Sequence, residues 1–77
     1  MAGLSYYLPG GRADTDSSPF EKSYIVLDGE LEVTDGSGEA FTLRPFDSCH
    51  IAPGECRAVH NRTNRMATLL VIIPHKA

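Results

Sequence analysis

The chain has 77 residues, of which 42% are apolar and 22% charged, a composition that predicts one small globular domain and excludes a disordered chain. The net charge of −3, the absence of a cluster of Lys or Arg and the lack of an apolar run of about 20 residues exclude nucleic acid and membrane as main partners. The first residues lack the pattern of a secretory signal, so we expect a cytoplasmic protein in which Cys49 and Cys56 stay reduced.

Short, β-branched and apolar segments alternate with turn residues along the chain, which is typical of an antiparallel sandwich or barrel. In chain order, strands are predicted at residues 4–8, 23–27, 30–34, 40–43, 48–52, 56–60 and 67–73. The polar stretch 12–18 is predicted to be a loop. Asp28-Gly29 and Pro53-Gly54 each predict a hairpin that joins the two strands beside it.

Two of these strands, in residues 24–27 and 67–73, are apolar on both faces. A strand of this kind cannot have one face in water, so each should be covered on both sides. Because the sequence predicts no helix that could cover them, we expect a second copy of the chain to do so and the protein to be a homodimer. Phe20 and Phe41 are expected to fill the core.

Two stretches carry glycine, proline and polar residues at regular spacings. One extends from Gly10 to Gly29, and the other from Phe46 through Pro53-Gly54 to Asn61. Their spacing resembles the two signature motifs of the cupin superfamily, G-x5-H-x-H-x(3,4)-E-x6-G and G-x5-P-x-G-x2-H-x3-N, with Phe46 in place of a glycine. The resemblance implies an all-β fold, an antiparallel cupin-type β-barrel of jelly-roll-like form, as a single domain over residues 1–77.

The cupin-like register also identifies four special positions. The positions that hold the metal in metal-dependent cupins fall on Asp16, Ser18, Lys22 and Arg57. An ammonium and a guanidinium carry only donors and repel a cation, so we expect neither a metal nor another cofactor there. The resemblance implies further strands before Gly10 that this sequence mostly lacks. Either a partner completes the barrel or additional residues precede Met1.

In this register, alternate residues of two strands should line the interior, because residues two apart on a strand share a face. The inward residues would be Lys22, Tyr24 and Val26 on one strand and Arg57, Val59 and Asn61 on another, with Asp16 and Ser18 approaching from the loop. Two cations and one carboxylate leave a net positive charge. Such an interior suits a small anionic organic ligand.

The enzymatic interpretation is a metal-independent lyase, isomerase or cyclase. It assigns proton transfer to Lys22, binding of a carboxylate or oxyanion to Arg57, and the orientation of both groups to Asp16. The further residues that would contact the ligand are Ser18, Tyr24 and Asn61.

Two other interpretations stay open. In a non-catalytic binding or structural domain, an ion pair of Asp16 with Arg57 or Lys22 takes the place of the metal, and core side chains fill the interior. In a metal enzyme with atypical ligands, His50 or His60 acts together with Asp16.

Overall fold

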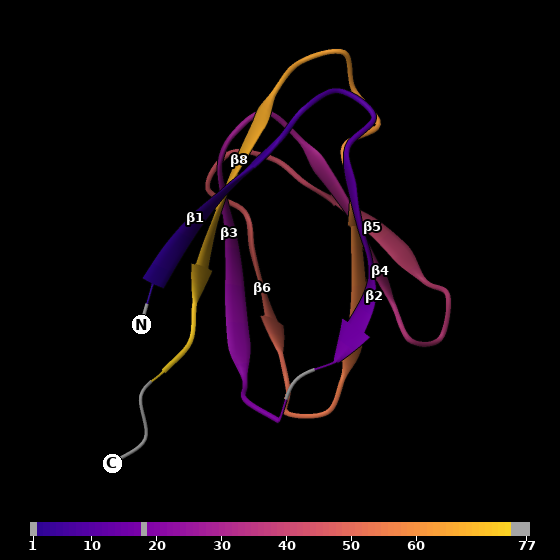
Figure 1. Cartoon of the computed structure of the whole chain (residues 1–77), viewed down its shortest axis with the longest axis vertical. Coiled ribbons are helices and arrows are strands. Elements are labelled where there is room, and N and C mark those ends of the chain that lie inside the picture. The colour runs from indigo at the N-terminus through magenta and orange to yellow at the C-terminus, as the bar shows by residue number, and fades with distance from the viewer. Residues whose placement is uncertain (1, 18, 75–77) are drawn as a thin grey trace.

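Two four-stranded antiparallel sheets face each other in the computed structural model (Figure 1). The structure describes residues 2–17 and 19–74, with the side chains of all of these except 14–17. The strands are β1 (Ala2–Tyr7), β2 (Arg12–Ser17), β3 (Lys22–Asp28), β4 (Leu31–Asp35), β5 (Ala40–Leu43), β6 (Ser48–Ile51), β7 (Cys56–His60) and β8 (Ala67–Ile72). The first sheet has the order β1-β8-β3-β6 and the second the order β2-β7-β4-β5.

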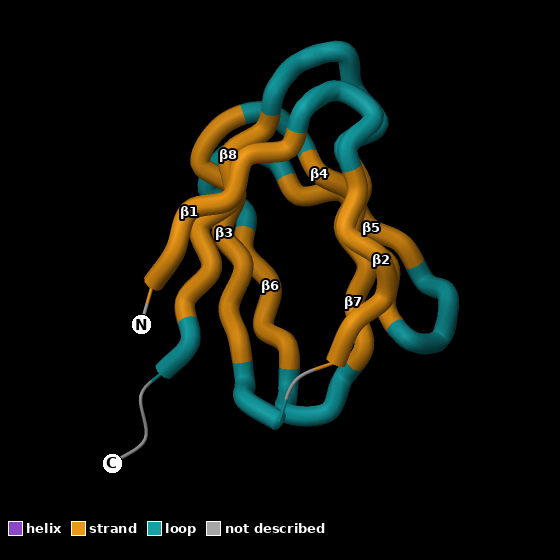
Figure 2. Tube along the Cα trace, in the orientation of Figure 1, coloured by secondary structure: helices purple, strands orange, loops and turns teal. Residues whose placement is uncertain are grey.

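The all-β prediction is confirmed, since the described residues are strands, turns and loops (Figure 2). Within this part of the chain, no helical segment has the length and hydropathy that crossing a bilayer requires. The predicted strands are present, with ends displaced by two residues at most. The loop predicted at 12–18 is wrong, because residues 12–17 form β2, an edge strand paired with β7. An edge strand is held by main-chain hydrogen bonds to one neighbour and needs no apolar pattern.

Both predicted hairpins are wrong for one reason. The strands on either side of Asp28-Gly29, β3 and β4, lie in different sheets, as do β6 and β7 on either side of Pro53-Gly54. Gly29 has a φ of 76°, and a Cβ at this position would lie 2.8 Å from the carbonyl oxygen of Met66, so glycine is required. A turn sequence specifies the local bend, whereas burial of the apolar faces determines which strands pair.

The core lies between the two sheets and comes from alternate residues of their strands. Its buried hydrophobic residues are Val26, Leu31, Val33, Leu43, Val59, Ala67 and Leu69. Phe20 and Phe41 are 62% and 38% exposed, so the expectation that they fill the core is wrong. Phe20 lies in the turn before β3 and Phe41 on the edge strand β5, where fewer neighbours are available to cover a ring.

Phe46, which takes the place of a glycine in the cupin-like motif, has a φ of 71°. This left-handed conformation costs a residue with a Cβ roughly 1–2 kcal/mol. Main-chain hydrogen bonds hold the turn in place, because Phe46 N donates to the Val26 oxygen at 2.7 Å and Val26 N donates to the Asp47 oxygen at 3.1 Å. These two hydrogen bonds hold the turn against β3, so Phe46 keeps its strained conformation.

Replacing Phe46 with glycine should therefore raise the free energy of unfolding by about 0.5–1 kcal/mol, the relief of strain less the added chain entropy of glycine. Little burial is lost, because Phe46 is 83% exposed. Urea denaturation at low protein concentration measures this change. The reverse substitution, Gly54→Ala, should lower stability by about 1 kcal/mol, because Gly54 has a φ of 82° that strains a residue with a Cβ. An added Cβ there would meet no atom within 4 Å, so backbone strain is the cost that this variant measures. A less stable Phe46→Gly variant would contradict the strain argument.

Candidate functional site

The residues predicted to point inward lie on β3 of the first sheet and β7 of the second. Lys22 and Tyr24 are half-buried and share the face of β3 that carries the fully buried Val26. Arg57 in the same way shares the face of β7 that carries the buried Val59. The two inner faces therefore bring Lys22, Tyr24 and Arg57 to the space between the sheets.

Arg57 is almost enclosed, with 11% of its side chain exposed. Its Nη2 lies 3.0 Å from Oε2 of Glu55, and its Nη1 donates to the carbonyl of Cys56 at 3.2 Å. Its Nε is buried and has no hydrogen-bond partner among the side chains that the structure describes. Among the described residues, the N–H on Nε of Arg57 is therefore left to donate a hydrogen bond to an acceptor oxygen of a ligand.

Glu55 is a site residue that the sequence reasoning missed. Its Oε1 accepts a hydrogen bond of 2.7 Å from the main-chain N–H of Ala52, while its Oε2 pairs with Arg57. The bond from Ala52, and after it the charge of Arg57, lower the pKa of Glu55, so its carboxylate is ionised at neutral pH. The available signal was its place at the end of the turn that begins at Ala52, two residues before Arg57.

Asp35 lies directly opposite Arg57 on the neighbouring strand β4. Its Oδ1 accepts hydrogen bonds from the hydroxyl and main-chain N–H of Ser37 and from the N–H of Glu39. The Ser37 hydroxyl is the main cause of the lowered pKa of Asp35, and Arg57 adds to it. Asp35 thus closes the β4–β5 turn and places a second ionised carboxylate next to the strand of Arg57.

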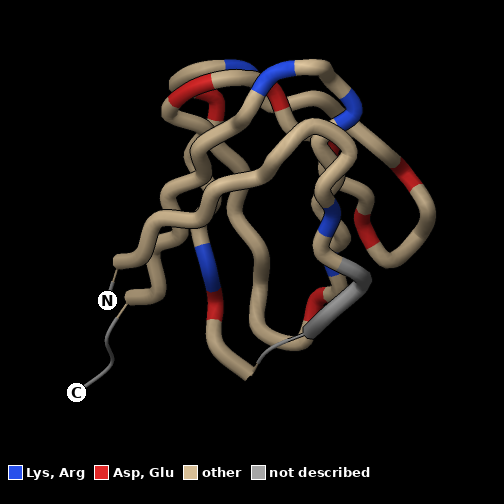
Figure 3. Tube along the Cα trace, turned by 45° about the horizontal axis from the view of Figure 1, so that its top comes forward, with Lys and Arg blue, Asp and Glu red and all other residues tan. Residues whose placement is uncertain are grey.

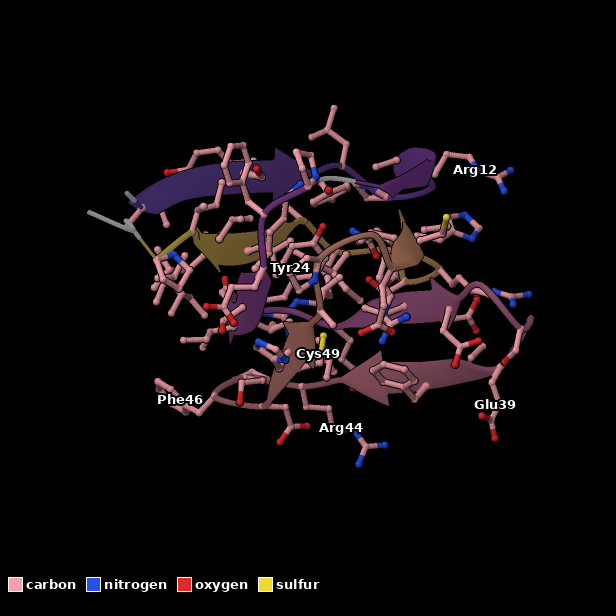
Figure 4. All side chains as sticks on the ribbon, turned by 90° about the horizontal axis from the view of Figure 1, so that it is seen from below. Arg12, Tyr24, Glu39, Arg44, Phe46 and Cys49 are labelled. Atoms are coloured by element: carbon pink, nitrogen blue, oxygen red, sulfur yellow. The ribbon has the colours of Figure 1, made fainter. Side chains whose placement is uncertain are left out.

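Cys49 on β6 turns its thiol toward the same interior. It is half-buried and is the register partner of Tyr24, beside which it lies in Figure 4. Burial raises the pKa of Cys49, and the charge of Arg57 acts in the opposite direction. The thiol is therefore protonated at neutral pH and acts as a small, weakly polar wall of the site. Cys49 and Cys56 are both free thiols.

Asp16 is the register partner of Arg57 on β2, so Arg57 has Asp16 on one side and Asp35 on the other in the second sheet. The side chain of Asp16 and the whole of Ser18 lie outside the described residues. The ion pair that the structure does show for Arg57 is the one with Glu55.

The four positions of the cupin-like register do not suit a divalent cation. Lys22 and Arg57 offer N–H donors and no lone pair, so they cannot be ligands. Among the side chains that are described, no three His, Cys, Asp or Glu residues come together as a metal would require. His50 is exposed and its Nε2 lies 2.9 Å from Glu21, and His60 alternates with the inward residues of β7. Neither histidine shares the inner face with Arg57.

Asn61 is fully buried, and the protein itself uses its whole amide. Its Nδ2 donates to the carbonyls of Tyr7 at 2.9 Å and Arg65 at 2.7 Å. Its Oδ1 accepts from the main-chain N–H of Thr63 at 3.0 Å and from the hydroxyl of Thr63 at 2.7 Å. No donor or acceptor of the amide is left for a ligand. We therefore assign Asn61 to the fold and leave it out of the proposed site.

The two lowered pKa values predict a loss of stability in acid. A carboxylate whose pKa is lower in the folded chain than in the unfolded chain stabilises the fold at every pH above its unfolded pKa. This stabilisation is lost as the pH falls through the pKa of the folded chain. The free energy of unfolding should thus decline below pH 4.5, the ordinary value for a glutamate. Glu55→Gln should be less stable at neutral pH and decline less steeply, as measured by urea denaturation across this range. Glu39→Gln, in the β4–β5 turn, is the control, and an unchanged slope for Glu55→Gln would contradict the assignment.

Comparison with known proteins gives one close relative in sequence. The chain is 51% identical over 73 residues to Beta-D-galactosidase Rv1717 of Mycobacterium tuberculosis, an alignment that covers 95% of this chain. The chain spans 62% of the length of that relative. The relative's activity as a whole protein is therefore a starting point for a proposal about this chain.

The solved structures that the chain resembles carry varied functions. A predicted oxalate decarboxylase from Thermotoga maritima has a TM-score of 0.86 at 23% identity, covering 95% of this chain and 64% of that one. The CENP-C cupin domain of Drosophila melanogaster has a TM-score of 0.87 at 21% identity, covering 96% and 60%. At such identities the likeness shows the fold alone. The family model described as "Cupin domain" matches residues 3–73, and the chain therefore belongs to the cupin family.

Proposed function

We propose that this cupin domain binds a small, neutral, hydroxyl-rich molecule of the sugar class between its two sheets, with Arg57 as the main hydrogen-bond donor. The observation that carries the proposal is the ion pair of Arg57 with Glu55 at 3.0 Å. Because Glu55 balances the charge of Arg57, the site offers N–H donors and carboxylate acceptors side by side. Sugar hydroxyls both donate and accept, and so fit this combination.

This charge balance changes the class of ligand expected from the sequence. Two cations and one carboxylate suit an anion, but Glu55 and Asp35 add two ionised carboxylates near Arg57. An anionic ligand would have to displace Glu55 from Arg57 or bind beside it against like charge. A neutral ligand has to do neither, so it fits the site better.

A β-D-galactoside is the first sugar to test, because the 51% identical relative is named as a β-D-galactosidase. Glycoside hydrolysis needs an ionised carboxylate on one side of the scissile bond and a proton donor on the other. In this proposal Glu55 supplies the carboxylate, which takes a proton from the water that adds to the sugar carbon as the glycosidic bond breaks. Asp35 is ionised as well, so Lys22, half-buried on the facing strand, is assigned to donate the proton, and Arg57 to hold a sugar oxygen.

The test measures both turnover and binding. The wild-type chain is incubated with 4-nitrophenyl β-D-galactoside, and binding of D-galactose and of galacturonate is followed by calorimetry. We expect release of nitrophenol from the β-anomer and not from the α-anomer, and tighter binding of galactose than of galacturonate. Glu55→Gln should lower turnover about 100-fold, while Glu39→Gln should leave it unchanged.

Each other outcome selects a rival. Binding of galactose without turnover makes the chain a non-catalytic sugar-binding domain. Tight binding of galacturonate with no affinity for galactose overturns the neutral-ligand proposal. It would favour the lyase, isomerase or cyclase interpretation, which acts on an anionic compound and for which the buried Nε of Arg57 is the supporting observation.

A further inference from the structure

On the inner face of the first sheet, the row of side chains next to the buried core is uncharged. Val71 of β8, Tyr24 of β3 and Cys49 of β6 are register partners, and all three are half-buried and packed against the core. The neighbouring row toward the core is Val26 and Leu69, which are 0% and 1% exposed. The apolar row, defined as Val71, Tyr24 and Cys49, therefore lies one inward-facing position outside the closed core.

The corresponding row of the second sheet carries charge. Asp16 of β2, Arg57 of β7 and Asp35 of β4 are register partners. The neighbouring row toward the core is Val59 and Val33, both buried. The ionic row, defined as Asp16, Arg57 and Asp35, thus also lies one inward-facing position outside the core.

The two rows face each other across the space between the sheets. Their neighbouring core rows belong to one packed cluster, and both rows lie on the side of that cluster nearest the turn between β6 and β7 (Figure 1). Burial is the main cause of the raised pKa of Cys49, but the charges of Arg57 and Glu55 also act on it, so these groups lie near the thiol. In Figure 3 the charged residues in the strands of the first sheet lie only at the ends of β3, at Lys22 and Asp28. The site therefore has one apolar wall and one ionic wall.

A sugar ring matches two such walls best when its C–H groups gather on one face. In galactose, the C–H groups of the third, fourth and fifth ring carbons lie on the same face, because the hydroxyl of the fourth carbon is axial. In glucose, the C–H group of the fourth carbon points to the other face and interrupts the patch. An aromatic ring packs well on a contiguous C–H face, because the face of the ring is negative and the C–H hydrogens are positive.

We propose that the site selects galactosides over glucosides by seating the C–H face of the sugar on the apolar row, with Tyr24 as the specificity-determining residue. This selection rests on the proposed sugar-binding function and adds to it the residue that reads the configuration of the sugar. Tyr24 carries the aromatic ring of the apolar row and lies at its centre, between Val71 and Cys49. The ionic row can bond hydroxyls of either sugar, whereas contact with the apolar row depends on the configuration at one carbon.

Calorimetry tests the proposal with methyl thio-β-D-galactoside and methyl thio-β-D-glucoside, which resist hydrolysis and differ only at the fourth carbon. The wild-type chain should bind the galactoside roughly 10-fold more tightly. Tyr24→Leu should lower this preference to about 2-fold by weakening the binding of the galactoside alone, and Tyr24→Phe, which keeps the ring, should restore it. Tyr6→Leu is the matched control, because Tyr6 is 62% exposed on the outer face of the same sheet, and it should keep the wild-type preference. Urea denaturation checks the folding of each variant, and the wild-type ratio tests the selection independently of them.

Two results would overturn the selection while leaving the sugar-binding function in place. Equal affinity of the wild type for the two glycosides would show that the apolar row does not read the sugar. An unchanged preference in Tyr24→Leu would remove the role of Tyr24. Binding of neither glycoside is a different result, because it contradicts the sugar-binding function itself and the selection with it.

Discussion

Replacing Asn61 with alanine is expected to lower the free energy of unfolding by about 3 kcal/mol or more, a large part of the stability of a small domain. The side chain is 0% exposed and makes four hydrogen bonds. Alanine would leave the carbonyls of Tyr7 and Arg65 without these donors. It would also release the Thr63 turn before β8. The residue ties the end of β1 to the β7–β8 connection, so its loss should affect both sheets.

Urea denaturation of Asn61→Ala measures the loss, with Asn64→Ala as the matched control. Asn64 is an exposed residue of the same connection, and its replacement should change stability by less than about 0.5 kcal/mol. Asn61→Asp keeps the shape but removes the two N–H donors, and it should be no more stable than the alanine variant. A loss below about 1 kcal/mol for Asn61→Ala would show that water replaces these bonds easily.

Replacing Arg57 with methionine is expected to weaken galactose binding, and turnover of the nitrophenyl galactoside, roughly 100-fold. Methionine fills a similar volume without the guanidinium, so the walls of the site persist while its main donor is lost. The fold should tolerate the change. Glu55 keeps its bond from Ala52 and is 41% exposed, so its carboxylate is not left as an unpaired buried charge.

The control for this variant is Arg62→Met, which removes an arginine whose side chain is 65% exposed and which pairs with Glu32 on the outer face of the second sheet. Binding and turnover should be unaffected by it. If Arg57→Met retained full affinity for galactose, Arg57 would be a structural residue and the ligand would lie elsewhere. Calorimetry and the galactoside assay on both variants, with urea denaturation to confirm folding, separate these outcomes.

Most of the strands could be predicted because their signals are local. The segment 30–34 alternates between polar and apolar residues, the segment 67–73 is apolar except for Thr68, and they match β4 and β8 to within one residue at each end. β2 could not be found in this way. Its stability comes from main-chain pairing with β7, a partner about forty residues away, and main-chain pairing leaves no mark in side-chain type.

The candidate site was predictable only in part. The cupin-like spacing identified Lys22, Tyr24 and Arg57, and the structure places them on inner faces of the two sheets. The spacing also selected Asn61, but it could not show that four protein groups already occupy its amide. Glu55 was missed because its role depends on two simultaneous contacts, one with the main-chain N–H of Ala52 and one with the guanidinium of Arg57.

The sequence by itself determined the class of the fold, the strands with strong local patterns and the positions where a cupin would hold a metal, since all of these depend on spacing along the chain. The tertiary structure decided which strands pair, that the fold itself uses the amide of Asn61, and how the charge of Arg57 is balanced. These features depend on residues brought together from distant parts of the chain. Asp28-Gly29 shows the difference, because the dipeptide specifies a bend but the shared core of Val26 and Leu31 places its two strands in opposite sheets.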